Sequence, residues 1–246
     1  MPNIKVEIEY EGTNYAGWQV QNNSRKKTIQ QLLEKALQKI LREKIHLIVS
    51  GRTDSGVHAL AQVANFRTKS KIPLNKLPIA LNALLPKDIA ISKAEEKPAG
   101  FHSRFDAKSK IYRYRILNRP HPSPLQRKTA YFYRYPLNIR RMRKESKVLL
   151  GRHNFRSFQA SDKTERDSVK TIKDIKITVH SGFIHIDIEA DGFLYNMARN
   201  IAGTLIEIGR GRFVPGDLKR ILLACDRKTA GPTAPAKGLC LMKVKY

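Results

Sequence analysis

The chain has 246 residues, with 47 Lys and Arg against 21 Asp and Glu, and a formal net charge of +26 at pH 7. This excess favours a polyanionic partner such as nucleic acid, because lysine and arginine displace counterions condensed on phosphates. Two cysteines are too few for a disulfide framework or a zinc site, and no run approaches the ~18 apolar residues of a membrane span. Because the N-terminus has no apolar signal core, we expect a reduced, cytoplasmic protein.

The first fifty residues predict a strand, a helix and a second strand. Residues 4–10 alternate apolar with charged side chains, as a half-buried strand does. Thr28 and Gln31 form a capping box that opens the clearest helix of the chain. The apolar side chains of that helix share one face: Ile29, Leu32, Leu33, Ala36, Leu37, Ile40 and Leu41. Residues 45–50 are expected to form the second strand.

Asp54 follows that strand, in a loop bracketed by Gly51 and Gly56, with Arg52 two residues before it. A carboxylate at the end of a strand suits a nucleophile, a base, a metal ligand or a turn. Because Asp-Ser-Gly is also a good turn sequence, the spacing alone leaves catalysis and a structural turn both open.

The remaining segments continue to mix strands with helices. The expected strands are 61–67, 89–94, 110–117, 172–180, 183–190 and 239–246. The expected helices are 74–85, 139–150, 194–208 and 216–225. This pattern predicts an α+β fold. We place the domain boundary after residue 105, giving an N-terminal half, 1–105, with the Asp54 loop, and a C-terminal half, 106–246.

A basic segment with interleaved aromatic residues spans this boundary. From Arg104 to Lys144 the sequence has 13 Lys and Arg and a single acid, Asp106. The aromatic residues are Phe101, Phe105, Tyr112, Tyr114, Tyr131, Phe132 and Tyr133. Guanidinium groups beside aromatic rings suit the phosphates and bases of single-stranded nucleic acid, although a solvated basic face is the plainer alternative. The spacing of a helix-turn-helix or a zinc finger is missing, which disfavours a DNA-binding protein.

Six blocks in order along nearly the whole chain resemble the tRNA pseudouridine synthase A family. They are residues 15–19, 51–59, 101–107 followed by 112–114, 153–158, 193–203 and 233–239. This agreement is far more specific than any single motif. Departures are modest: Ser55, Lys110 and Ala198 stand where the family commonly has alanine, arginine and valine.

The resemblance implies an isomerase that converts uridine to pseudouridine at positions 38, 39 and 40 of the tRNA anticodon stem-loop. It implies no metal and no organic cofactor. It further implies a homodimer, and two ferredoxin-like or RNP-like halves whose sheets join side by side around a central basic cleft, with helices on the outer face.

The resemblance also assigns roles to residues. Asp54 matches the carboxylate that attacks the target ribose, either by bonding to C1′ or by taking a proton from C2′. Arg199 matches the arginine that pairs with it. Tyr112 matches the tyrosine that stacks on the target base. Arg52 matches the residue that grips the flipped nucleotide, and Leu239 is a candidate for packing against the base. Candidate contacts to the RNA backbone are Arg104, Lys110 and Arg113.

Without the resemblance, Tyr112 would be an ordinary strand tyrosine and Arg199 a surface contact to phosphate. Two other functions remain as alternatives. One is a pseudouridine synthase for other RNA uridines, because target choice depends on the shape of the cleft. The other is a non-catalytic RNA-binding or ribosome-associated protein, which explains the charge and the aromatic residues but not the ordered motifs.

Overall fold

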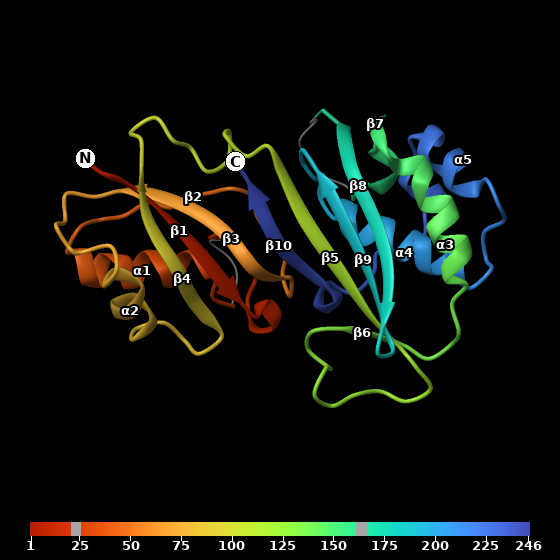
Figure 1. Cartoon of the computed structure of the whole chain (residues 1–246), viewed down its shortest axis with the longest axis horizontal. Coiled ribbons are helices and arrows are strands. Elements are labelled where there is room, and N and C mark those ends of the chain that lie inside the picture. Colours follow the sequence, from red (N-terminus) through yellow and green to blue (C-terminus); the bar gives the residue numbers. More distant parts are fainter. Residues whose placement is uncertain (21–25, 161–166) are drawn as a thin grey trace. The chain divides into compact units, whose positions relative to one another are not determined.

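A computed structural model of the chain describes residues 1–20, 26–160 and 167–246. The chain forms two compact units (Figure 1). Unit 1 comprises Met1–Lys108 together with Cys240–Tyr246, and unit 2 comprises Ser109–Leu239.

Unit 1 is a ferredoxin-like arrangement of strands and helices. Its elements in chain order are β1 (Asn3–Tyr10), α1 (Ile29–Leu41), β2 (Ile48–Val49), β3 (His58–Arg67), α2 (Leu77–Asn82) and β4 (Ile89–Lys97). The strands lie in the order β4-β1-β3-β2, and every neighbouring pair is antiparallel. This is the order expected of a βαββαβ unit. A further strand, β10 (Leu239–Lys245), runs parallel to β3, with Cys240 opposite His58.

The alternating sequence of β1 explains the core of unit 1. Ile4, Val6, Ile8 and Tyr10 are all buried, whereas the side chains between them are less so. Helix α1 begins at Thr28, whose hydroxyl accepts a hydrogen bond from the Gln31 backbone N–H at 3.3 Å, as the capping motif predicts. Its apolar face is buried through Ile29, Leu33, Leu37 and Leu41.

Unit 2 also mixes strands with helices, but in a different succession, with two strands before its first helix and three strands after it. Its main elements are β5 (Ser109–Asn118), β6 (Tyr131–Tyr133), α3 (Ile139–Ser146), β7 (Gly151–Asn154), β8 (Val169–His180), β9 (Phe183–Ala190), α4 (Met197–Gly209) and α5 (Asp217–Ala224). The strands lie in the order β5-β9-β8-β7, and β6 pairs with β5 in parallel. Figure 1 shows α3, α4 and α5 grouped beside β7, β8 and β9.

The sheet of unit 2 has one apolar face and one charged face. Across the antiparallel pair, the buried Tyr112 and Tyr114 of β5 oppose Ile188 and Ile186 of β9. On the other face, Arg113 opposes Asp187. Helix α4 supplies much of the core, because nearly all of its residues are buried.

The α+β prediction is confirmed, while several element boundaries differ from those expected. The strand predicted at 45–50 is reduced to Ile48–Val49, and the helix predicted at 74–85 to Leu77–Asn82. The helix predicted at 139–150 ends at Ser146 and continues as a 3-10 turn. The chain divides into the two units after Lys108, and residues 240–246 fall in unit 1, where β10 pairs with β3.

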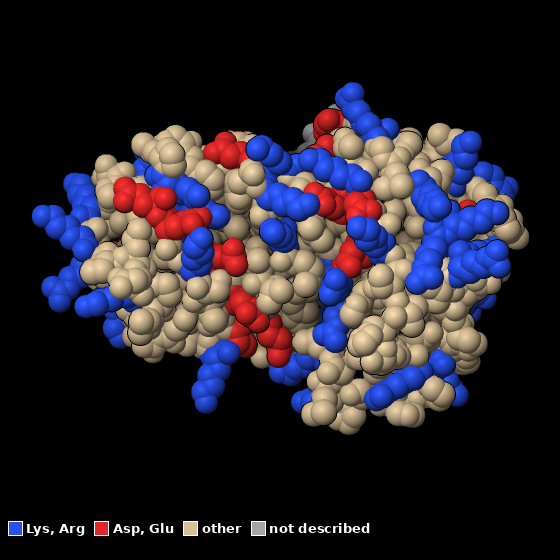
Figure 2. Space-filling model, in the orientation of Figure 1, with Lys and Arg blue, Asp and Glu red and all other residues tan. Residues whose placement is uncertain are grey.

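Cations outnumber anions on the surface, as the composition of 47 Lys and Arg against 21 Asp and Glu implies. Figure 2 shows Lys and Arg side chains spread over the visible face, with Asp and Glu in smaller groups. Within the described part of the chain, no helix is long and apolar enough to cross a membrane.

Candidate active site

The predicted catalytic loop of unit 1 joins β2 to β3 and alternates buried and more exposed residues. Thr53 is buried, Arg52 is exposed and Asp54 is half-buried. The Val57 backbone N–H donates to the Asp54 carbonyl at 3.1 Å, which closes a turn around Gly56 with its φ of +78°. The side chain of Thr53 therefore points into unit 1, whereas those of Arg52 and Asp54 lie nearer to solvent.

A second loop, residues 11–19, holds the Asp54 loop from its other side. The Trp18 backbone N–H donates to the Thr53 carbonyl at 3.0 Å, and the Ser55 hydroxyl donates to the Tyr15 carbonyl at 2.9 Å. Gly17 has a φ of +94°, and a Cβ there would lie 2.5 Å from the Thr53 carbonyl oxygen. Only glycine allows the two backbones to approach this closely.

His58, the histidine of the same motif, has a structural hydrogen bond. The Gly12 backbone N–H donates to its Nδ1 at 3.0 Å, so this nitrogen acts as the acceptor of a neutral ring. The histidine is 6% exposed. His58 therefore has a structural role in the motif, because its ring connects the loop 11–19 to the start of β3.

Tyr112, the predicted base-stacking residue, lies on β5 in unit 2. Its ring contacts Phe193 edge to face, with ring centroids 4.9 Å apart and an interplanar angle of 78°. Two cations lie near Tyr112 on the same strand, and both are half-buried. Arg113 forms a bidentate ion pair with Asp187, at 2.7 and 2.9 Å, and Lys110 is the second cation.

Arg199 lies in the first turn of α4 and is oriented by two hydrogen bonds. Its Nε donates to the Ala234 carbonyl and its Nη1 to the Asn196 Oδ1, both at 2.8 Å. The Ala234 backbone N–H returns a bond to the Arg199 carbonyl at 3.2 Å. Asn196, which precedes the helix, adopts a left-handed backbone with a φ of 60°. The guanidinium is therefore fixed between the start of α4 and the loop 231–238.

That loop, residues 231–238, is packed closely on its neighbours in unit 2. The Tyr114 hydroxyl donates to the Pro235 carbonyl at 2.9 Å, and a Cβ at Gly238 would lie 2.6 Å from the Tyr114 ring. Leu239, which follows, is 5% exposed. The structure thus brings Arg199 and the closing motif together, as parts of one unit.

The predicted residues are divided between the two units. Asp54, Arg52 and Arg104 belong to unit 1, and Tyr112, Lys110, Arg113, Arg199 and Leu239 belong to unit 2. Arg104 is exposed, and its guanidinium lies 5.6 Å from the centre of the Phe105 ring. Among the described residues, no group of three or more His, Cys, Asp and Glu is placed to hold a metal ion.

Comparison with known proteins places this arrangement in a family. A model of the tRNA pseudouridine synthase family matches residues 7–106 and 146–246. Relatives match along the whole chain. The tRNA pseudouridine synthase A of Thermoanaerobacter sp. (strain X514) is 46% identical over 246 residues, which is 100% of both chains. The chain belongs to the tRNA pseudouridine synthase A family.

Two further relatives agree with this result. The tRNA pseudouridine synthase A 2 of Clostridium tetani is 48% identical over 99% of this chain and 98% of its own. The protein of the same name from Clostridium perfringens is 47% identical over the full length of both. The family model covers Asp54 and Arg199 but not residues 107–145, so Tyr112 lies in the segment that it leaves unmatched.

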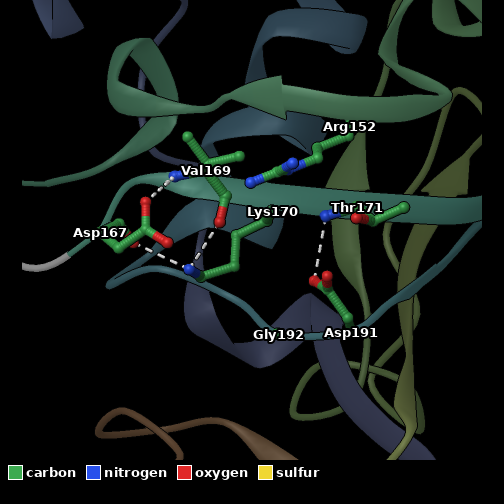
Figure 3. Close-up of a pocket in the computed structure, with 7 residues that line it drawn as sticks. All are labelled: Arg152, Asp167, Val169, Lys170, Thr171, Asp191 and Gly192. Carbon is green, nitrogen blue, oxygen red and sulfur yellow. Dashed lines mark hydrogen bonds between the residues drawn. The ribbon is translucent and has the colours of Figure 1, made fainter.

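One surface pocket of unit 2 is lined by none of the residues predicted for the pseudouridine synthase site. It has a volume of about 300 Å³ and is lined by Arg152, Asp167, Val169, Lys170, Thr171, Asp191 and Gly192 (Figure 3). Its polar groups bond to one another. The Lys170 Nζ donates to the carbonyls of Asp167 and Val169, and the Asp191 carboxylate accepts from the Thr171 backbone N–H at 3.0 Å. These contacts stabilise neighbouring strand ends.

Sequence reasoning missed several residues that hold the candidate site together, above all Tyr10, Gln62 and Asn196. Gln62 gave only a weak signal, since Asn65 and Arg67 are also polar residues of the same predicted strand. Tyr10 was assigned to the strand without any role at the loop. Asn196 lies in a block that resembles the family, but no function was attached to it.

Proposed function

We propose that this chain isomerises uridine to pseudouridine at positions 38, 39 and 40 of the tRNA anticodon stem-loop, with Asp54 attacking the target ribose. The observation that carries the proposal is the Asp54 loop, held by backbone and side-chain hydrogen bonds in a chain that aligns with tRNA pseudouridine synthases along its whole length. The family makes the chain an isomerase.

The chemistry is an internal exchange of bonds. The bond between C1′ and N1 breaks, the uracil turns, and a bond between C1′ and C5 forms. The C5 proton passes to the Tyr112 hydroxyl or to a water bound to it, while N1 takes a proton from the solvent. A carboxylate beside C1′ stabilises the positive charge that develops on the sugar, as in glycosidases. One carboxylate suffices, because the detached base takes the place of water as the second nucleophile.

The other predicted residues take supporting roles in this proposal. Arg199 is proposed to pair with the Asp54 carboxylate, as the matching arginine does in the family. The rigid attachment of its Nε and Nη1 supports a fixed position for the guanidinium. Tyr112 holds the detached uracil against its ring, and Leu239 packs against the base.

The target uridine must leave the stack of the anticodon arm before it reacts. Unstacking costs a few kcal/mol, which contacts to the flipped nucleotide offset. Arg52, exposed beside Asp54, is the proposed grip for that nucleotide. Arg104, Lys110 and Arg113 are proposed contacts to the RNA backbone, although the ion pair of Arg113 with Asp187 competes with phosphate. The enzyme is proposed to act in the cytoplasm as a homodimer.

The test is Asp54→Asn. We expect this variant to bind an anticodon stem-loop tRNA transcript with unchanged affinity and to lose at least about 10³-fold of the isomerisation rate, because the amide cannot act as the nucleophile. Release of tritium from C5-labelled uridine measures the rate, and carbodiimide mapping locates the product. Near-normal isomerisation by Asp54→Asn would refute the assignment. Wild-type product outside positions 38 to 40 would instead indicate another target uridine.

A further inference from the structure

A buried chain of hydrogen bonds lies beneath the Asp54 loop, wholly within unit 1. It links Tyr10 at the end of β1, Thr53 in the loop and Gln62 on β3. These side chains are almost inaccessible to solvent: Gln62 is 0% exposed, Tyr10 3% and Thr53 6%. None of them was assigned a role in the reaction.

The orientation of the Gln62 amide is fixed by four bonds. Its Nε2 donates to the Gly51 carbonyl at 2.9 Å and to the Tyr10 hydroxyl oxygen at 3.3 Å. Its Oε1 accepts from the Ser50 hydroxyl at 2.8 Å and from the Val63 backbone N–H at 3.2 Å. Both donors and both lone pairs of the amide are thus occupied, so the side chain has a single arrangement.

Tyr10 joins Gln62 to Thr53. Its oxygen accepts from the Gln62 amide and lies 2.7 Å from the Thr53 Oγ1, in a hydrogen bond in which either hydroxyl can donate. Burial raises the pKa of the Tyr10 hydroxyl, so the group stays neutral at any physiological pH.

Thr53 is held at two points. Its hydroxyl is bonded to Tyr10, and its carbonyl accepts from the Trp18 backbone N–H at 3.0 Å. A residue fixed at both its side chain and its backbone leaves little freedom to its immediate neighbours. Those neighbours are Arg52 and Asp54, the two predicted functional side chains of the loop.

We propose that Tyr10, Thr53 and Gln62 form a positioning clasp that fixes the Asp54 carboxylate at the distance required for attack on the ribose. This inference rests on the proposed role of Asp54. The three residues act through the loop backbone and need not touch the RNA. A displacement of about 1 Å at a reacting group can cost on the order of 10²-fold in rate, which sets the scale of the expected effect.

The test uses two variants that each lose one hydroxyl. Tyr10→Phe removes it, and Thr53→Val replaces it with a methyl group. We expect each to lower the single-turnover rate of isomerisation by roughly 10- to 100-fold, while the Kd for tRNA changes by less than about twofold. The double variant should be no slower than the slower single variant, since both remove the same contact. Thr53→Ser keeps the hydroxyl and should restore the rate.

A matched control is Tyr246→Phe. The Tyr246 hydroxyl also donates a single bond in unit 1, to the Ser103 carbonyl at 2.8 Å, but the ring lies by Lys5, toward the other end of β1. We expect Tyr246→Phe to keep the wild-type rate. Equal rate losses in Tyr246→Phe and Tyr10→Phe, or a Thr53→Ser variant as slow as Thr53→Val, would overturn the clasp.

Asp54→Asn, measured in the same assay, separates the proposed function from the proposed positioning role of the clasp. An active Asp54→Asn would refute the proposed function itself. An inactive Asp54→Asn beside clasp variants of wild-type rate would refute only the positioning role. If Tyr10→Phe fails to fold, the comparison of Thr53→Val with Thr53→Ser decides the question.

Discussion

The two units hold their functional loops by different chemistry. In unit 1 the Asp54 loop is held by neutral groups, namely hydroxyls, a glutamine amide and backbone N–H donors. In unit 2 the loop 231–238 is held by guanidinium groups in addition to neutral donors such as the Tyr114 hydroxyl. Arg199 donates to the Ala234 carbonyl, and Arg227 donates to the Asn200 Oδ1 and the Thr233 Oγ1, both at 3.1 Å.

This difference changes how the basic composition is interpreted. Part of the positive charge of unit 2 serves internal contacts, as when Arg143 donates to the Ile177 carbonyl at 2.7 Å and Arg113 pairs with Asp187. Burial lowers the pKa of the Arg227 guanidinium, whose described acceptors are uncharged. The net charge therefore indicates the class of partner, but it overstates how many cations are available to RNA.

The largest expected effects come from one glycine in each unit. A Cβ at Gly12 would lie 1.9 Å from the Val57 carbonyl oxygen, and a Cβ at Gly203 would lie 1.8 Å from the Pro232 carbonyl oxygen. We expect Gly12→Ala and Gly203→Ala each to lower the free energy of unfolding by about 3 kcal/mol, because backbone must move in both. Urea denaturation measures the loss.

Hydrogen exchange then assigns each loss to a unit. Gly12→Ala should speed exchange in β1, and Gly203→Ala should speed exchange in α4. Gly100→Ala is the control, since a Cβ at Gly100 meets nothing within 4 Å. Equal destabilisation by Gly100→Ala would contradict the role of close backbone contact.

A smaller effect is expected from Arg227→Met, which tests whether the Arg227 guanidinium holds the loop 231–238 to α4. The change leaves the Ala230 carbonyl and part of the Asn200 amide without a donor. We expect the free energy of unfolding to fall by about 1–3 kcal/mol. The exposed Arg220, paired with Asp217 on α5, provides the control. If Arg220→Met costs as much as Arg227→Met in urea denaturation, the internal role of Arg227 is wrong.

The smallest effect concerns Glu95 in unit 1, which lies among Lys93, Lys5 and Lys97. The hydrogen bond from Lys93, followed by that from Lys5, lowers the pKa of the Glu95 carboxyl from 4.5 to about 2. Because the folded-state pKa is lowered, the ionised group stabilises the fold above about pH 4.5, and this contribution is lost as the pH falls towards 2.

Exposure limits that contribution to less than about 1 kcal/mol. Glu95→Gln should therefore reduce stability slightly at pH 7 and make the urea midpoint less dependent on pH between 4.5 and 2. Glu96→Gln, at the exposed neighbouring position, serves as the control. An unchanged pH profile in Glu95→Gln would show that the three lysines contribute nothing to stability.

Local patterns in the sequence predicted the elements well where one face is buried. The alternation of Ile4, Val6 and Ile8 gave β1, and the capping residue Thr28 gave the start of α1. Prediction failed where tertiary pairing sets the length of an element. The apolar run 45–50 suggested a full strand, but only Ile48 and Val49 pair with β3.

The candidate site shows the same limit. The motif located Asp54, because its residues are consecutive. The contacts that hold it are not local: Tyr10 meets Thr53 across 43 residues, and Arg199 meets Ala234 across 35. A single sequence carries no signal for such pairs, since each partner is ordinary in its own segment.

The return of β10 to unit 1 has a consequence for synthesis on the ribosome. β10 pairs with β3 at His58 and Ala59, but it follows all of unit 2 in the chain. While unit 2 is being translated, β10 has not yet been made. The segment of β3 beside the Asp54 loop therefore lacks its β10 partner during that time. Such an unpaired edge is open to pairing with other chains. We therefore expect nascent chains stalled before residue 239 to need protection by a chaperone. This need should end once β10 has left the ribosome and pairs with β3.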